Sequence, residues 1–162
     1  MSFLGVKGRT TIAFGLLWPL AACSGESAPD DTVTLVDEGA LCLFAGEPSA
    51  IAMVTGSITD GAQQDYVVGE PILFQVRVSD CLSSSCDVDR VASCGVAHDG
   101  QVLTVSSHLS YQKLDSPHCT MDCGALSATC ASEPLVAGSY TVLHGEQSFS
   151  VDVPSSSTAC AR

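Results

Sequence analysis

Nine cysteines are the residues of this sequence whose type and spacing predict the most chemistry. Cys23 directly follows a short apolar segment, and the other eight are distributed through the rest of the chain. If the chain is exported, an even number of cysteines predicts disulfide bonds, because exported proteins meet oxidising compartments. The eight candidates for disulfide bonding are Cys42, Cys81, Cys86, Cys94, Cys119, Cys123, Cys130 and Cys160.

The connectivity of these cysteines stays open, because eight cysteines allow on the order of a hundred different pairings. We take the local pair Cys81–Cys86 and the terminal pair Cys42–Cys160 as first guesses. One disulfide typically stabilises a fold by about 2 to 4 kcal/mol, so four would be comparable with the whole stability of a domain of this size. That contribution matters here, because few large aromatic residues are present to build a core.

A zinc site is the first alternative use of the cysteines, since His118 and Cys119 are followed closely by Cys123 and Cys130. No pair among them has the Cys-x-x-Cys spacing of a zinc knuckle or of a thioredoxin-like redox motif. Disulfide bonding is therefore favoured over zinc binding, and no cofactor is expected.

A calcium site is the second metal hypothesis, because Asp80, Asp87 and Asp89 cluster around the segment from Cys81 to Cys86. Carboxylate oxygens are the ligands that calcium prefers. The cluster lacks the third acidic position and the glycine of the EF-hand loop, so solvated loop charges are the favoured interpretation.

Serine hydrolysis would need a histidine base, and the chain offers His98, His108, His118 and His144. None of them lies in a recognisable catalytic motif, and no Gly-x-Ser-x-Gly elbow is present. His98 and His144 stand next to glycines in predicted turns, and His108 alternates onto the polar side of a predicted strand. We therefore interpret all four as surface residues and predict no catalytic residue.

The N-terminal segment has the composition of an export signal. Lys7 and Arg9 form a positive region, and residues 12–20 are apolar but too short to span a bilayer as a helix. The sequence Leu20-Ala21-Ala22-Cys23 resembles the lipobox of bacterial lipoproteins. This resemblance implies that Cys23 becomes the acylated N-terminus of the mature chain, and that Ser24, in place of aspartate, directs it to the outer membrane.

The resemblance divides the chain into three segments: a signal peptide over residues 1–22, a lipidated cysteine and short tether over residues 23–31, and one domain over residues 32–162. A simple secretory signal cut near the same alanines is the alternative. Removing residues 1–22 leaves four basic residues against 18 acidic ones, a net charge of −14. That charge repels nucleic acids and anionic lipid headgroups, so it fits either a protein partner with a basic surface or simply high solubility.

Apolar and polar residues alternate with a period of two along much of the chain, as in half-buried strands. The clearest runs cover residues 72–78, 102–111 and 149–153, and Asp99-Gly100 is a predicted hairpin turn. Several short strands and no run of helical period predict an all-β fold, an antiparallel β-sandwich. The shorter predicted strands cover residues 33–36, 41–44, 50–54, 91–97 and 140–144.

Leu135, Gly138 and Tyr140 have the Leu-x-x-Gly-x-Tyr spacing of a tyrosine corner. The motif resembles the start of the penultimate strand in immunoglobulin-like and fibronectin-III-like sandwiches. It implies that the tyrosine hydroxyl bonds backward to the chain and that the last strand comes after a short loop. The mature chain lacks the core tryptophan and the two-cysteine plan of true immunoglobulin domains, so the resemblance extends to the architecture alone.

Together these features predict a lipid-anchored, non-enzymatic interaction or structural module at the bacterial cell envelope, bound to the membrane through its anchor. The alternative is an exported enzyme inhibitor or hydrolase that uses the cysteine-rich segment 119–130. A disulfide-braced loop is a preorganised binding surface, which is what an inhibitor requires.

Overall fold

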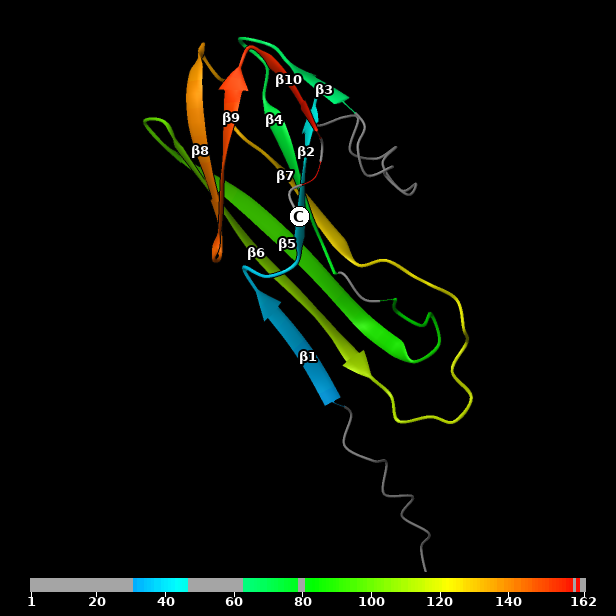
Figure 1. Cartoon of the computed structure of the whole chain (residues 1–162). Coiled ribbons are helices and arrows are strands. Elements are labelled where there is room, and N and C mark those ends of the chain that lie inside the picture. The colour runs from blue at the N-terminus through cyan, green and yellow to red at the C-terminus, as the bar shows by residue number, and fades with distance from the viewer. Residues whose placement is uncertain (1–30, 47–62, 79–80, 159, 161–162) are drawn as a thin grey trace, which may run out of the picture.

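The structure is a computed structural model that describes residues 31–46, 63–78, 81–158 and 160 (Figure 1). The predicted signal peptide, Cys23 and the predicted strand over residues 50–54 lie outside these residues. Within them, the regular elements are strands, and no helix long and apolar enough to cross a membrane is found. The strands are β1 (Asp31–Val36), β2 (Ala40–Ala45), β3 (Gln63–Tyr66), β4 (Ile72–Arg77), β5 (Asp87–Asp99), β6 (Val102–Lys113), β7 (Ser127–Ala131), β8 (Gly138–His144), β9 (Gln147–Val153) and β10 (Ser155–Thr158).

The long strand β6 organises the larger sheet. It pairs along its whole length with β5, and Gly100 occupies the hairpin turn between them with φ 61°. The other edge of β6 is shared: β1 runs antiparallel to its C-terminal half, whereas β8 runs parallel to its first residues and pairs with β9. The β6–β8 pair is the parallel exception in a sandwich predicted to be antiparallel.

The second layer is a sheet of β2, β4 and β7, and a small antiparallel pair of β3 and β10 completes the fold. A disulfide between Cys94 of β5 and Cys130 of β7 links the two larger sheets. Phe74 of β4 and Leu103 of β6 belong to the apolar core, and neither is exposed to solvent. The predicted all-β, disulfide-rich sandwich is thereby confirmed.

The predicted alternation is confirmed in β6 and β9. Leu103, Val105, Leu109 and Tyr111 are buried on one side of β6, while Thr104, Ser106 and His108 are exposed on the other. The prediction of a half-buried strand over residues 72–78 is wrong, because Leu73 and Gln75 are buried together with Phe74 and Val76. β4 lies between β2 and β7 in the middle of its sheet, and burial of its successive residues shows that both of its faces are covered.

The tyrosine corner has the geometry that its sequence motif implies. The hydroxyl of Tyr140 donates a hydrogen bond to the carbonyl oxygen of Val136 at 3.0 Å. The Tyr140 ring and Leu135 are both buried in the core, and β8 begins at Gly138. Because the hydroxyl is satisfied by the chain just upstream, the ring can pack inward without leaving a buried polar group unpaired.

Candidate functional site

The first candidate site lies where β5 begins and β6 ends. Asp87 of β5 pairs with Lys113 of β6, so the segments that leave these strands run side by side (Figure 1). Two disulfides, Cys86–Cys119 and Cys81–Cys123, connect the segments. Residues 81–86 and 119–123 therefore form one closed covalent ring, which we call the cysteine ring.

The predicted pair Cys42–Cys160 is confirmed, whereas the predicted pair Cys81–Cys86 is wrong. Cys86 stands just before β5 and Cys119 comes after β6, and antiparallel pairing brings those two ends together. The partner of each cysteine is thus set by strand register, which overrides the local pairing suggested by spacing. Cys119, Cys123 and Cys130 each belong to a different disulfide. Their sulfurs are therefore not free to bind zinc together with His118.

Backbone contacts attach the cysteine ring to the domain. Leu82 and Gly124 exchange two hydrogen bonds, Leu82 N to Gly124 O at 3.2 Å and Gly124 N to Leu82 O at 2.7 Å. The Leu82 side chain is buried, and Arg90 donates to the Ser83 carbonyl oxygen at 2.7 Å. A Cβ at position 124 would lie 2.8 Å from a guanidinium nitrogen of Arg90 and 3.0 Å from the Leu82 carbonyl oxygen, so a larger residue at this crossing would have to displace the Arg90 side chain.

Side-chain hydrogen bonds fix the two arms of the ring against each other. Thr120 donates its backbone N–H to the Ser85 hydroxyl at 2.8 Å, and its own hydroxyl lies 3.1 to 3.3 Å from the hydroxyls of Ser83, Ser84 and Ser85. The Asp122 carboxylate accepts from Ser84 N at 3.2 Å and from the Thr120 hydroxyl. Hydrogen bonds from the Ser84 side chain first, and then from the Thr120 side chain and the Ser84 N–H, lower the pKa of Asp122 to about 2, so the charged form persists in acid.

Met121 lies between Cys119 and Cys123, and its apolar side chain is fully exposed to solvent. Its neighbours Thr120 and Asp122 direct their side chains to the opposite arm of the ring. Met121 was not among the residues predicted from the sequence. A single apolar residue in the middle of a Cys-x-x-x-Cys segment was the available signal, but its exposure depends on the disulfide pairing.

The calcium candidates are not brought together in the described residues. Asp80 lies outside them, and Asp87 is buried with its carboxylate accepting a hydrogen bond from Ser83 N at 2.6 Å. Asp89 is exposed and has φ 49° at the irregularity in β5. No group of three or more His, Cys, Asp or Glu residues in the described part of the chain is placed to hold a metal ion.

The second candidate site contains the residue types of a serine hydrolase. His98, His108 and His118 are exposed as predicted, but the prediction of a surface position for His144 is wrong, because only 1% of it is exposed. His144 ends β8 beneath the bend between β1 and β2, and its Nε2 lies 3.0 Å from the Ser107 hydroxyl. Ser107 faces the core on β6. The sequence could have indicated this, because Ser107 has the same spacing of two as its buried neighbours Val105 and Leu109.

Asp37 holds the bend above these two residues. Its φ of 54° lies in the left-handed region that aspartate tolerates better than most residues. Asp37 N donates to Ser107 O at 2.9 Å, and Ser107 N donates to the Asp37 carboxylate at 2.6 Å. Gly145 packs directly against the Asp37 carbonyl oxygen, with no room for a Cβ and with φ 55°. The bend, β6 and the β8–β9 turn are therefore locked together.

The geometry of Asp37, Ser107 and His144 differs from that of a catalytic triad. In a triad the carboxylate accepts a hydrogen bond from the imidazole and orients it. Here the carboxylate bonds to the Ser107 backbone, and His144 Nδ1 has no hydrogen-bond partner among the described residues. Ser107 is itself buried, so no substrate carbonyl can reach its hydroxyl. This arrangement supports a structural role.

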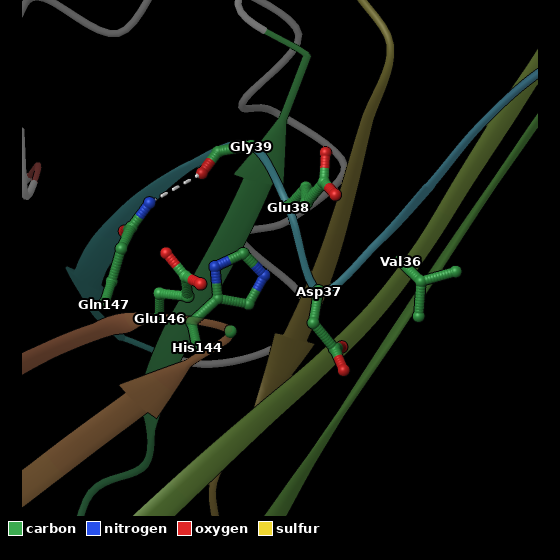
Figure 2. Close-up of a pocket in the computed structure, with 8 residues that line it drawn as sticks. Val36, Asp37, Glu38, Gly39, His144, Glu146 and Gln147 are labelled. Atoms are coloured by element: carbon green, nitrogen blue, oxygen red, sulfur yellow. Dashed lines mark hydrogen bonds between the residues drawn. The ribbon is translucent and has the colours of Figure 1, made fainter.

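A cavity of about 600 Å³ lies beside this cluster, between residues 36–39 and residues 144–147 (Figure 2). Its polar lining includes Glu38, Glu146 and Gln147, and Gln147 donates to the Gly39 carbonyl oxygen at 3.1 Å. This hydrogen bond joins the two walls. Asp37 and His144 also line this cavity, in the arrangement described above, which lacks the carboxylate–imidazole hydrogen bond of a catalytic triad among the described residues.

Burial of His144 predicts a pH dependence of stability. Burial lowers the pKa of His144 below its ordinary value near 6.5, and the nearby Asp37 carboxylate opposes this only in part. The unfolded chain therefore takes up the proton first, and the stability contributed by neutral His144 is lost as pH falls from about 6.5 through the folded pKa.

We expect urea unfolding between pH 8 and pH 5 to show this loss, and the variant His144→Gln to lack that part of the slope. The exposed His108→Gln is the matched control and is expected to keep it. Parallel curves for the native protein and His144→Gln would contradict the assignment.

The chain matches no protein-family model, no curated protein and no solved structure. Its function is therefore inferred from its own residues. Of the two candidate sites, the cluster around His144 is buried, whereas the cysteine ring is covalently fixed and presents an apolar side chain to solvent.

Proposed function

We propose that this protein is a lipid-anchored lipoprotein of the bacterial cell envelope that binds another protein through its cysteine ring and catalyses no reaction. The observation that carries this proposal is the full exposure of Met121 on a segment fixed at both ends by disulfides. The lipobox-like sequence ending at Cys23 supports the anchor, and Ser24 supports the outer membrane as its destination.

Rigidity of the ring favours binding. Association normally loses free energy when loops and side chains become ordered at an interface. In the cysteine ring this ordering is already present in the free protein, because Thr120 and Asp122 are hydrogen-bonded to the opposite arm. An exposed methionine then offers an adaptable apolar contact that a partner can bury.

The position of the ring relative to the tether limits where binding takes place. Asp31, the first residue of β1, pairs with Lys113 at the end of β6 from which the ring extends (Figure 1). Because β1 begins at Asp31, the free tether covers residues 24–30 and reaches at most roughly 25 Å when fully extended. The ring would therefore act close to the membrane surface, toward a partner whose basic surface complements a net charge of −14.

The anchor is tested by mass spectrometry of the purified mature protein before and after reduction. We expect an N-terminal Cys23 that carries acyl chains and a mass increase on reduction that corresponds to four disulfides. The variant Cys23→Ser is expected to lack the acyl chains. An unmodified N-terminus at another residue would refute the anchor.

The binding surface is tested by introducing a photo-crosslinking amino acid at position 121 in the envelope of living cells. We expect one dominant protein adduct. The same amino acid at the exposed Val136, near the opposite end of β6, is the control and is expected not to give that adduct. Identical adducts at both positions, or none at position 121, would refute the ring as the binding surface.

A further inference from the structure

We infer that the partner is a serine protease with an apolar primary pocket, and that residues 119–123 occupy its active-site cleft like a substrate, with Met121 in that pocket. This inference rests on the proposed function of the cysteine ring as the binding surface. It identifies the protein as an inhibitor of the partner, because the ring resists the cleavage that an ordinary substrate undergoes.

The conformation of the segment suits a protease cleft. Residues 119–123 belong to no helix or strand, so their backbone is not committed to a sheet partner. The side chains of Thr120 and Asp122 turn toward residues 83–85, which leaves Met121 to point away from the domain. A protease cleft binds such a segment by inserting one side chain into its primary pocket.

The chemistry of Met121 selects the kind of pocket. Its side chain is apolar, flexible and unbranched, so it fills a deep hydrophobic slot and offers no charge to an acidic pocket. Pockets with an aspartate at their base, which select lysine and arginine, are therefore disfavoured. Binding in an apolar slot buries a side chain that the free protein leaves fully exposed.

The disulfides determine the outcome of an attack by the protease. The catalytic serine hydroxyl would add to the Met121 carbonyl carbon, and its proton would pass through the histidine to the departing Asp122 amine. The Met121 side of the break remains tied through Cys119 to Cys86, and the Asp122 side remains tied through Cys123 to Cys81. Residues 81–86 join the two halves, so the amine cannot diffuse away.

Retention of the amine favours the reverse reaction. In an ordinary substrate the leaving amine departs and water hydrolyses the acyl-enzyme. Within the ring the Asp122 amine stays beside the acyl carbon, where its effective concentration is high, and its attack restores the peptide bond and frees the serine. The hydrogen bonds that Thr120 shares with Ser85 and that Asp122 accepts from Ser84 hold both ends in position for this step.

The test titrates the full mature chain, with its disulfides intact, against chymotrypsin, elastase and subtilisin, while hydrolysis of a small chromogenic substrate is monitored. We expect stoichiometric inhibition of at least one of these proteases. Met121→Gly is expected to weaken that inhibition by at least about 30-fold, the effect of losing an interface hot spot. Met121→Lys is expected to transfer inhibition to trypsin. Val136→Gly, at another exposed apolar residue, is the control and is expected to inhibit normally.

Opening the ring tests retention of the amine directly, because loss of a simple surface contact would weaken inhibition without making it temporary. In the double variant Cys81→Ser and Cys123→Ser, the Asp122 side of the break is held only by longer covalent paths, the shortest through residues 123–130 and the Cys94–Cys130 disulfide, so the amine can move away from the acyl carbon. Inhibition is expected to become temporary and to end with cleavage after Met121. Circular dichroism checks that the variant is folded.

In these binding and inhibition assays, three results would overturn the inference: no inhibition of any of the three proteases, rapid cleavage of the intact ring, or Met121-dependent binding of the Cys23→Ser chain to neutral phosphatidylcholine vesicles. A strong adduct at position 121 with a protein other than a protease would overturn this inference and leave the proposed function standing. The absence of any adduct there would refute both.

Discussion

Replacement of both Cys42 and Cys160 by alanine is expected to lower the free energy of unfolding by about 4 kcal/mol. The bridge joins residues separated by 118 positions, so it closes a very long loop and strongly restricts the unfolded chain. Cys42 lies within β2 and is completely buried, which places the bridge inside the second layer. Guanidinium unfolding of the native protein and the double variant measures the difference.

The bridge between Cys81 and Cys123 provides the comparison for this effect, because its sequence separation is 42. Loop-closure entropy grows with the logarithm of loop length, so removal of this shorter bridge is expected to destabilise the domain by about 1 kcal/mol less. An equal or larger loss for the shorter bridge would show that loop length does not govern these disulfides.

The variant Phe74→Ala is expected to lower the free energy of unfolding by about 3 to 5 kcal/mol. Phe74 lies in the middle of β4, the central strand of its sheet, and is completely buried. Removal of its ring leaves a cavity that the strands on either side cannot fill, because β2 and β7 hold β4 by register on both edges. Denaturant unfolding with an unchanged m-value is the measurement.

Two further variants separate the cavity from the loss of apolar area alone. Phe74→Leu retains most of the volume and is expected to destabilise the domain by about 1.5 kcal/mol or less. Val136→Ala changes an exposed side chain and is expected to alter stability by about 0.5 kcal/mol at most. If Phe74→Ala were as mild as Val136→Ala, the core position of β4 would be incorrect.

The elements predicted best from the sequence are those whose two faces meet different environments. In β6 and β9 one face packs on the core and the other meets solvent, so apolar and polar residues alternate along the sequence. The turn at Gly100 and the corner at Tyr140 were also predictable, because each depends on residues adjacent in sequence. β4 was misjudged since a strand covered on both faces loses the polar half of its pattern.

The features that escaped prediction depend on contacts between distant residues. His144 is buried because the bend at Asp37, more than a hundred residues away in sequence, closes over it. The pairing of Cys86 with Cys119 results from the register of β5 and β6. Exposure of Met121 depends in turn on that pairing. The sequence indicates that disulfides form but leaves open which surface they create.

The shared location of β1 and the cysteine ring at one end of β6 has a mechanical consequence. With Cys23 held in the membrane and a partner holding the ring, tension enters at Asp31 and leaves beside Lys113, its neighbour across the β1–β6 ladder. Such tension breaks the hydrogen-bonded pairs of the β1–β6 ladder one after another, starting at the Asp31 end, as in unzipping. The core does not carry this load. The ladder opens until it reaches the two hydrogen bonds between Asp37 and Ser107.

Beyond that point the chain enters β2, where Cys42 is bonded to Cys160, so further extension would have to disrupt the second layer and the C-terminal segment together. Release of β1 would lengthen the tether by roughly 20 Å, at about 3.4 Å for each of its residues. In the proposed anchored state, β1 would thus provide extra length that lets the domain move with a partner away from the membrane while its disulfide-bonded body stays folded.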